Sequence, residues 1–227
     1  MDKGCELVRC EDNRGKFGGS ASYSSIFDQY YSRRDTLDLL GPVAGQTILD
    51  AGCGVGIYAR DLSRAGASVT GIDLSEEALR SARALAPASV SFIGADLNES
   101  LEFLGYRSFD AILCSLVLHY IEDWSAVLNE FKKLLKPQGR IVVSVQHPFA
   151  DYFDADSKDY YSKEIWYSGN LDRPFWRRSM EEILESLTSA GFAIDRVREP
   201  KPTCEWESSR RALPRLLAIR GRPANHG

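Results

Sequence analysis

The segment Ile48–Gly56, with the sequence ILDAGCGVG, constrains the fold more than any other part of this chain. An apolar run ends at the carboxylate of Asp50, and three glycines then stand at alternate positions. Because glycine has no Cβ atom, such a turn lets a ligand lie directly against the backbone. The helix predicted over residues 57–65 offers free N–H groups at its N-terminus. The segment therefore predicts a strand, turn and helix that bind a nucleotide-like ligand carrying a positive charge.

Two more acidic residues, Asp73 and Asp96, follow apolar runs in the same way as Asp50. Strands are predicted over residues 67–73, 90–96, 109–115 and 140–145. Their alternation with helices indicates a parallel sheet covered on both faces. The carboxyl ends of parallel strands meet at one edge, where open α/β sheets bind ligands. We therefore expect the three carboxylates at one ligand-binding edge.

Capping residues mark the ends of the predicted helices. Ser75 and Ser179 are each followed by two glutamates, which is typical of a helix N-terminus. Further helices are predicted over residues 33–40, ending at Gly41-Pro42, and over residues 125–135. The chain is expected to close with two strands, over residues 192–197 and 215–220.

Length and composition predict one globular domain in the cytoplasm. The 227 residues are enough for one sizeable core, and no apolar run approaches the roughly 20 residues that span a bilayer. The net charge of −4 argues against a nucleic-acid surface. The five cysteines include no CxxC pair, so neither a metal site nor a disulfide framework is predicted. Residues 1–20 are expected to be disordered, and residues 21–222 to form the domain.

With these motifs in order, the chain resembles the class I S-adenosylmethionine (SAM)-dependent methyltransferases of the small-molecule type, those with methyltransferase domains 11 and 25. The likeness covers about residues 23–222. Its motifs are ILDAGCGVG, GIDLS, GADL, FDAILCSLVLHYIEDW and LLKPQGRIVVSV. The resemblance implies an α/β Rossmann-like three-layer sandwich. Its seven-stranded sheet would be mostly parallel, with an antiparallel last strand.

The resemblance also implies the residues that bind the methionine and ribose parts of SAM. Asp50, Gly52 and Gly54 would border the methionine moiety, with Asp50 near its ammonium group. Asp73 would accept hydrogen bonds from both ribose hydroxyls, which suits the two oxygens of a carboxylate. The backbone of Ser115 would line the methionine pocket.

For the adenine, the resemblance implies a separate group of residues. Leu74 would pack on the ring, Asp96 would accept from the amino group, and the N–H of Leu97 would donate to the ring. The N-terminal aromatics either pack against the sheet or close over the cofactor. The tyrosines that would cover it are Tyr23, Tyr30 or Tyr31.

Two histidines are candidates for acceptor contact or general base. Methyl transfer from a sulfonium is an in-line displacement, so the protein contributes mainly positioning and exclusion of water. A base adds roughly 10²- to 10⁴-fold where the acceptor must lose a proton. His119 follows the fourth predicted strand and His147 the fifth, so both are expected near the methyl group. The alternative for each is a structural role in its loop.

Residues 148–178 are rich in aromatics and too long for an ordinary loop, which indicates a lid or substrate wall. The candidates for substrate contact are Trp166, Tyr167, Phe175 and Trp176. Ordinary packing over the sheet edge is the alternative. For Arg173, Arg177 and Arg178 the sequence favours a solvated face over contact with an acidic substrate group.

These observations predict an enzyme that transfers a methyl group from SAM to an O, N or C atom of a small molecule, in natural-product or other small-metabolite biosynthesis. S-Adenosylhomocysteine (SAH) would be the product. No metal, nucleic-acid or membrane partner is expected, and the oligomeric state is open. The alternatives are a protein of this fold with a non-methylating role, such as a cyclase, and an NAD(P)-dependent oxidoreductase. The oxidoreductase loop G-x-G-x-x-G would require glycine where Ile57 stands.

Overall fold

The structure is a computed structural model of the whole chain. It describes residues 33–149, 159–162, 165–166, 175–201 and 214–224. The predicted disorder of residues 1–20 and the candidates Tyr23, Tyr30, Tyr31, Tyr167 and Arg173 lie outside these residues.

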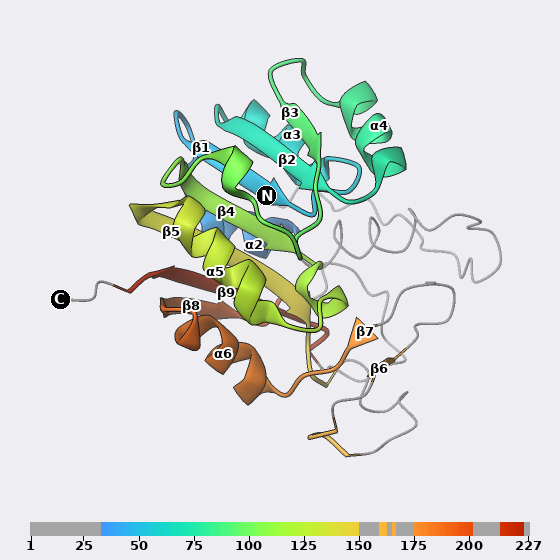
Figure 1. Cartoon of the computed structure of the whole chain (residues 1–227), viewed down its shortest axis with the longest axis vertical. Helices are drawn as coiled ribbons and strands as arrows, with labels where there is room; N and C mark the ends of the chain where they lie inside the picture. The colour runs from blue at the N-terminus through green and yellow to red at the C-terminus, as the bar shows by residue number, and fades with distance from the viewer. Residues whose placement is uncertain (1–32, 150–158, 163–164, 167–174, 202–213, 225–227) are drawn as a thin grey trace, which may run out of the picture.

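A seven-stranded sheet forms the middle layer (Figure 1). Its strands are β1 (Thr47–Ala51), β2 (Ser68–Asp73), β3 (Ser91–Gly94), β4 (Phe109–Ser115), β5 (Leu135–Gln146), β8 (Phe192–Arg198) and β9 (Leu216–Pro223). Their order is β3-β2-β1-β4-β5-β9-β8, and β9 is antiparallel to both of its neighbours. The predicted mostly parallel sheet with an antiparallel last strand is confirmed.

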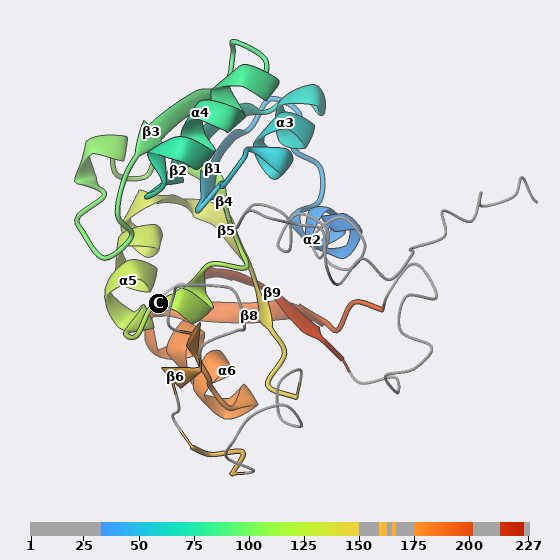
Figure 2. The same ribbon diagram turned by 90° about the vertical axis from the view of Figure 1, so that its right-hand side faces the viewer.

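Helices cover both faces of the sheet, as Figure 2 shows. On one face lie α2 (Arg33–Leu40), α3 (Ile57–Arg64) and α4 (Glu76–Leu85), and on the other α5 (Trp124–Leu134) and α6 (Met180–Ser189). Each face buries its own apolar core. Leu62 of α3 packs with Ile48 and Leu113 on one side, while Phe131 of α5 packs with Leu49 and Ile141 on the other. The strands are therefore apolar on both faces, as the nearly continuous apolar runs predicted.

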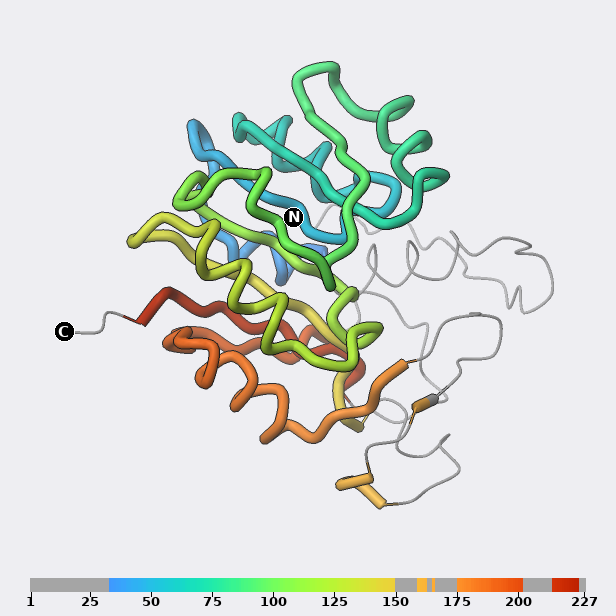
Figure 3. Tube along the Cα trace, in the orientation of Figure 1, coloured from blue at the N-terminus to red at the C-terminus, as the bar shows by residue number. Residues whose placement is uncertain are grey.

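The strand order reverses between β1 and β4, since β1 pairs with both β2 and β4. In Figure 3 the first half of the chain, coloured blue to green, forms one side of the sheet, and the second half forms the other. Ligands of open α/β sheets bind at the carboxyl ends of the strands beside such a reversal. The glycine turn after β1 lies at this point.

The predicted start of the fifth strand, at Arg140, is wrong by five residues. Leu135 pairs with Phe109, and the register then shifts so that Arg140 pairs with Ala111. The bulge accommodates the Lys-Pro-Gln-Gly sequence, residues 136–139, that follows the helix predicted over residues 125–135. Pairing with a long partner strand therefore outweighs the local turn signal.

The remaining elements are short. They are the 3₁₀ helices η2 (Glu102–Leu104) and η3 (Leu118–Tyr120) and the strands β6 (Ile165–Trp166) and β7 (Phe175–Trp176). β6 and β7 pair as a small antiparallel sheet within the predicted aromatic insertion. None of the helices in the described part of the chain is both long and apolar enough to cross a membrane.

The predicted N-caps are confirmed, and the cap of α6 is a complete capping box. The Ser179 hydroxyl accepts from the Glu182 N–H (3.1 Å), and the Glu182 carboxylate accepts from the Ser179 N–H (3.0 Å). We expect Ser179→Ala to lower the free energy of unfolding by about 1 kcal/mol. Urea denaturation checks this, with Thr188→Ala near the exposed end of the same helix as the matched control. An equal loss of unfolding free energy in both variants would contradict the assignment of Ser179 as the N-cap of α6.

Candidate functional site

The turn after β1 is held to β2 by its backbone. The N–H groups of Gly52 and Cys53 both donate to the carbonyl of Ile72, at 2.8 and 2.9 Å. The three glycines of the turn have φ values of +74° at Gly52, +52° at Gly54 and +75° at Gly56. Side chains rarely allow this left-handed region, which explains why glycine stands at each position.

The first two glycines of this turn have different surroundings. A Cβ atom at Gly52 would lie 2.3 Å from a methyl carbon of Val117, so Val117 covers this glycine. A Cβ atom at Gly54 would meet no atom of the described residues within 4 Å. Gly52 is thus required by packing within the protein, whereas Gly54 borders open space where a ligand can approach the backbone.

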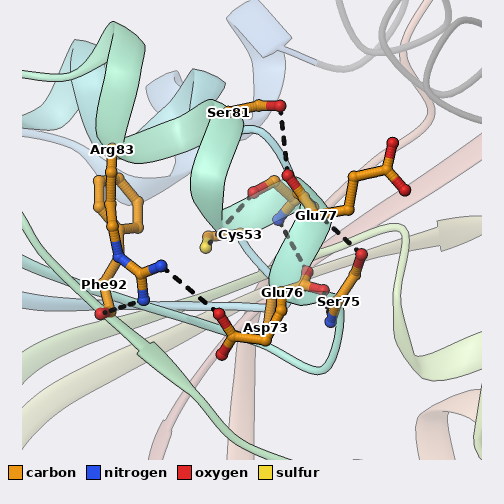
Figure 4. A network of polar contacts seen from close by, with 10 residues as sticks. Cys53, Asp73, Ser75, Glu76, Glu77, Ser81, Arg83 and Phe92 are labelled. Atoms are coloured by element: carbon orange, nitrogen blue, oxygen red, sulfur yellow. Dashed lines mark hydrogen bonds and ion pairs between the residues drawn. The ribbon is translucent and has the colours of Figure 1, made fainter.

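Asp73 joins the end of β2 to the glycine turn and to α4. Its Oδ2 accepts from the Gly54 N–H and its Oδ1 from the Ser75 N–H, both at 2.8 Å. Figure 4 shows Asp73 and Ser75 at the start of α4, with Cys53 of the turn beside them. Each carboxylate oxygen keeps further acceptor capacity, so Asp73 is fixed in place and still able to bind a pair of hydroxyls.

The predicted adenine contacts continue along the same edge. The Leu74 side chain is 61% exposed and Ile93 is 36% exposed, so an apolar surface lies open beside Asp73. The Asp96 carboxylate accepts from the backbone N–H and the side-chain amide of Asn98, both at 2.9 Å. Leu97 buries its side chain in the core, so only its backbone is available to a ligand.

Asp50 is buried at the end of β1, with 1% of its surface exposed. The negative charge of its carboxylate affects the pKa values of two neighbouring cysteines. Burial first, and then the Asp50 carboxylate, raises the pKa of the Cys53 and Cys114 thiols far above the usual range. Both cysteines therefore stay protonated and unreactive at neutral pH. The same negative charge favours a cationic group of a ligand beside the glycine turn.

The end of β4 carries a backbone conformation that is rare for its residue type. Leu116 has φ +57° and donates its N–H to the Ser144 carbonyl at 2.8 Å. Left-handed conformations of non-glycine residues concentrate at functional sites. The Ser115 hydroxyl lies 2.7 Å from that of Ser144 and 3.3 Å from that of Tyr58. These buried hydroxyls fix the loop that leads to Val117 and His119.

His119 lies in η3 and is almost completely buried, at 6% exposed. Its ring packs on Tyr120 and Phe175, with centroid distances of 4.2 and 4.7 Å, and its Nδ1 has no hydrogen-bond partner among the described residues. Burial first, and then the charge of Arg178, lowers the pKa of His119 to about 3. The imidazole is therefore neutral at neutral pH and a weak base.

His147, at the end of β5, has both ring nitrogens engaged. Its Nδ1 accepts from the Phe149 N–H at 3.1 Å, so Nε2 carries the proton and lies 3.0 Å from the Glu199 carboxylate. Burial lowers the pKa of His147, and Glu199 opposes that effect. This arrangement anchors the loop, and the ring would have to release Phe149 before it accepted a proton from a substrate.

The low pKa of His119 predicts a pH dependence of stability. The unfolded state, with an ordinary histidine pKa of 6.5, binds a proton that the folded state excludes until about pH 3. The stability is therefore full above pH 6.5 and falls as the pH drops toward 3. Between pH 7 and pH 5 the loss is about 2 kcal/mol, at about 1.4 kcal/mol per pH unit.

Urea denaturation at pH 7 and pH 5 measures this loss, with His119→Gln as the comparison. Between pH 7 and pH 5, the free energy of unfolding of the variant should fall by about 2 kcal/mol less than that of the wild type, because glutamine does not titrate. Equal sensitivity of the two proteins would show that His119 is accessible to protons in the folded state.

Comparison with known proteins agrees with this geometry. Residues 49–143 match the family model of a methyltransferase domain. A ubiquinone biosynthesis O-methyltransferase of Ralstonia nicotianae is 36% identical over 119 residues, which are 51% of this chain and 49% of the relative. A demethylmenaquinone methyltransferase of Tropheryma whipplei is 36% identical over 125 residues, 55% of this chain and 52% of the relative.

The structural comparison extends over more of the chain. The crystal structure of a SAM-dependent methyltransferase from Mesorhizobium loti matches with a TM-score of 0.72 and 29% identity, over 83% of this chain and 95% of that one. The chain carries a class I SAM-dependent methyltransferase domain. It spans about half the length of the curated relatives it matches.

In this methyltransferase domain, the structure brings the predicted cofactor residues of the described region to one edge. Asp50 and Asp73 lie at the carboxyl ends of β1 and β2, and the glycine turn, Leu74 and the Asp96–Leu97 pair come directly or shortly after the neighbouring strands. The open space beside Gly54, the buried charge of Asp50 and the exposed Leu74 fit a cofactor with an adenosine and a cationic amino-acid part. SAM, the cofactor of this family, has both.

The two arginines of the described insertion depart from the prediction of a solvated face. Arg177 is 8% exposed. Arg178 is partly buried, donates to the carbonyls of Ile121 (2.8 Å) and Glu122, and lies 4.7 Å from the ring centroid of Trp124. The prediction is therefore wrong for Arg177 and Arg178, because the residues around β7 pack back against η3.

Sequence reasoning missed three residues that shape the methyltransferase site: Val117, Tyr58 and Glu199. Val117 covers Gly52, Tyr58 reaches Ser115, and Glu199 pairs with His147. Each of these residues reaches its partner only because the order of strands in the sheet brings the two segments together. Glu199, for example, lies 52 residues from His147 in the chain. The position of Tyr58, directly after the glycine turn, was the one local signal.

Proposed function

We propose that this protein is a cytoplasmic methyltransferase that transfers the methyl group of SAM to a small-molecule acceptor, in the biosynthesis of a small metabolite. Its domain would extend over residues 21–222. The observation that carries the proposal is the row of carboxylates beside the glycine turn, next to a loop that leads from Ser115 to His119. The relatives named as a ubiquinone biosynthesis O-methyltransferase and a demethylmenaquinone methyltransferase support a small-molecule acceptor.

SAM, when bound, supplies an electrophilic methyl group on a sulfonium sulfur. The protein's part is to hold and orient it: Asp73 through the ribose hydroxyls, Leu74 and Asp96 through the adenine, and Asp50 through the ammonium group. The ordered turn and the Ser115 loop are already fixed by their own hydrogen bonds, so binding costs little reorganisation.

On the acceptor side, the lone pair of an O, N or C nucleophile must point at the methyl carbon with water excluded. His119 is the better placed of the two histidines. It is neutral and its Nδ1 has no hydrogen-bond partner among the described residues, so it is available to accept a hydrogen bond from an acceptor O–H or N–H. His147 would position the loop through Phe149 and Glu199. Trp166, Tyr167 and Trp176 remain candidates for the substrate wall.

Calorimetric titration with SAH tests the cofactor, with NAD as the competing ligand. Micromolar binding of SAH and none of NAD is expected, and failure of folded protein to bind SAH would overturn the proposal. SAM with a labelled methyl group then identifies acceptors. With an acceptor in hand, full turnover by both His119→Ala and His147→Ala would exclude base catalysis by either residue.

A further inference from the structure

The ring of Phe92, from the edge strand β3, packs against the end of the glycine turn. A Cβ atom at Gly56 would lie 3.0 Å from Cζ of this ring, and one at Gly71 of β2 would lie 2.8 Å from Cδ1 and Cε1. Phe92 thus fills the space that two glycines leave open. It also packs against the buried cluster that contains Ile48 and Leu62. The ring therefore links the end of the turn to this core.

Helix α4 closes the same glycine from a second side. A Cβ atom at Gly56 would lie 3.0 Å from Cβ of Ala82 in α4, as close as it would lie to the Phe92 ring. Figure 4 shows Arg83 of α4 reaching Phe92, whose carbonyl accepts from Nη2 of Arg83 at 3.1 Å. β3 and α4 are thereby tied to each other where both meet the turn.

The two ends of the turn are held in different ways. At its start, the N–H groups of Gly52 and Cys53 donate to the Ile72 carbonyl of the neighbouring strand. At its end, among the described residues, the backbone of Gly56 bonds only within the turn and α3. Gly56 is the N-cap residue of α3 and has no side chain to form a cap. Its position relative to the sheet is therefore set by packing, mainly against Phe92.

We propose that Phe92 is a positioning residue for SAM, because its ring holds the end of the glycine turn and with it the open backbone at Gly54. The inference rests on the proposed function, since it takes this turn as the contact with the cofactor. Glycine loses more conformational freedom on ordering than any other residue, so a ligand that must order a loose glycine turn binds less tightly. Packing against Phe92 restricts the turn before the cofactor arrives.

Phe92→Leu tests the proposal, with Phe192→Leu as the matched control. The control shortens a buried phenylalanine of β8, at the opposite edge of the sheet. Calorimetry at a temperature where circular dichroism shows each variant to be folded should give SAH binding weaker by about tenfold or more for Phe92→Leu. Phe192→Leu should bind SAH as the wild type does. If Phe92→Leu does not fold, Phe92→Met, which keeps more of the side-chain volume, takes its place.

Hydrogen exchange followed by NMR gives a second measurement that does not need the cofactor. In Phe92→Leu the amides of Gly54, Gly56 and Arg60, which report on the turn and the start of α3, should exchange about tenfold faster than in the wild type. Phe192→Leu should leave the exchange of these amides unchanged. A loss of stability that is shared by the whole fold would affect the two variants alike.

SAH binding by Phe92→Leu at the wild-type level, equally weakened binding in both variants, or unchanged exchange of the turn amides would overturn the proposal. The proposed function can fail separately. A wild type that does not bind SAH, together with faster exchange of the turn amides in Phe92→Leu, would overturn the methyltransferase function and leave the support of the turn by Phe92 standing.

Discussion

Asp73→Ala should lower the affinity for SAH by about a hundredfold or more. The carboxylate is expected to accept hydrogen bonds from both ribose hydroxyls, and a hydrogen bond to a charged group contributes about 1.5 kcal/mol or more, so two contribute about 3 kcal/mol. The variant also removes the acceptor of the Gly54 and Ser75 N–H groups, which loosens the turn that the cofactor contacts. Calorimetric titration with SAH measures the loss.

Two controls separate the lost contacts from general damage. Asp73→Asn keeps the shape and one acceptor oxygen, and should fall between wild type and Asp73→Ala. Glu77→Ala removes an exposed carboxylate from the first turn of α4 and should bind SAH as wild type does. Binding of SAH by Asp73→Ala within threefold of wild type would refute the assigned role.

Gly52→Ala should destabilise the fold by about 2–6 kcal/mol. The new Cβ atom would lie 2.3 Å from a Val117 methyl carbon, and φ at this position is +74°. Overpacking costs about 1–3 kcal/mol, and a left-handed conformation at a non-glycine residue costs a similar amount. Urea denaturation measures the change in the free energy of unfolding.

The double variant Gly52→Ala/Val117→Ala identifies the cause. Removing the two methyl groups leaves Val117 Cβ at 3.1 Å, so the double variant should be more stable than the sum of the single changes predicts. Gly54→Ala is the contrasting control, because none of the residues that the structure describes has an atom within 4 Å of its Cβ position. It should cost only about 1–2 kcal/mol of stability and act mainly on SAH binding. Additive effects of Gly52→Ala and Val117→Ala would contradict the steric explanation.

Most of the fold was predictable from the sequence because its signals are local. The alternation of apolar runs with capped helices predicted the parallel sheet, and Ser75 and Ser179 cap the helices that they were expected to cap. The start of β5 was not predictable, because Lys-Pro-Gln-Gly has the composition of a turn. Only the pairing of Leu135 with Phe109 reveals that it belongs to a strand.

The edge at the carboxyl ends of the strands and the surroundings of His119 also differ in how far the sequence predicted them. By itself, the sequence determined where Asp50, Asp73 and Asp96 would lie, because each follows a parallel strand and such strands end at a common edge. The environment of His119 and Arg177 was decided only in the tertiary structure. His119 becomes a neutral, weak base and Arg177 a buried cation because β7 packs on η3 across more than 50 residues of chain. Burial and charge depend on neighbours in space, and no local pattern in the sequence encodes those neighbours.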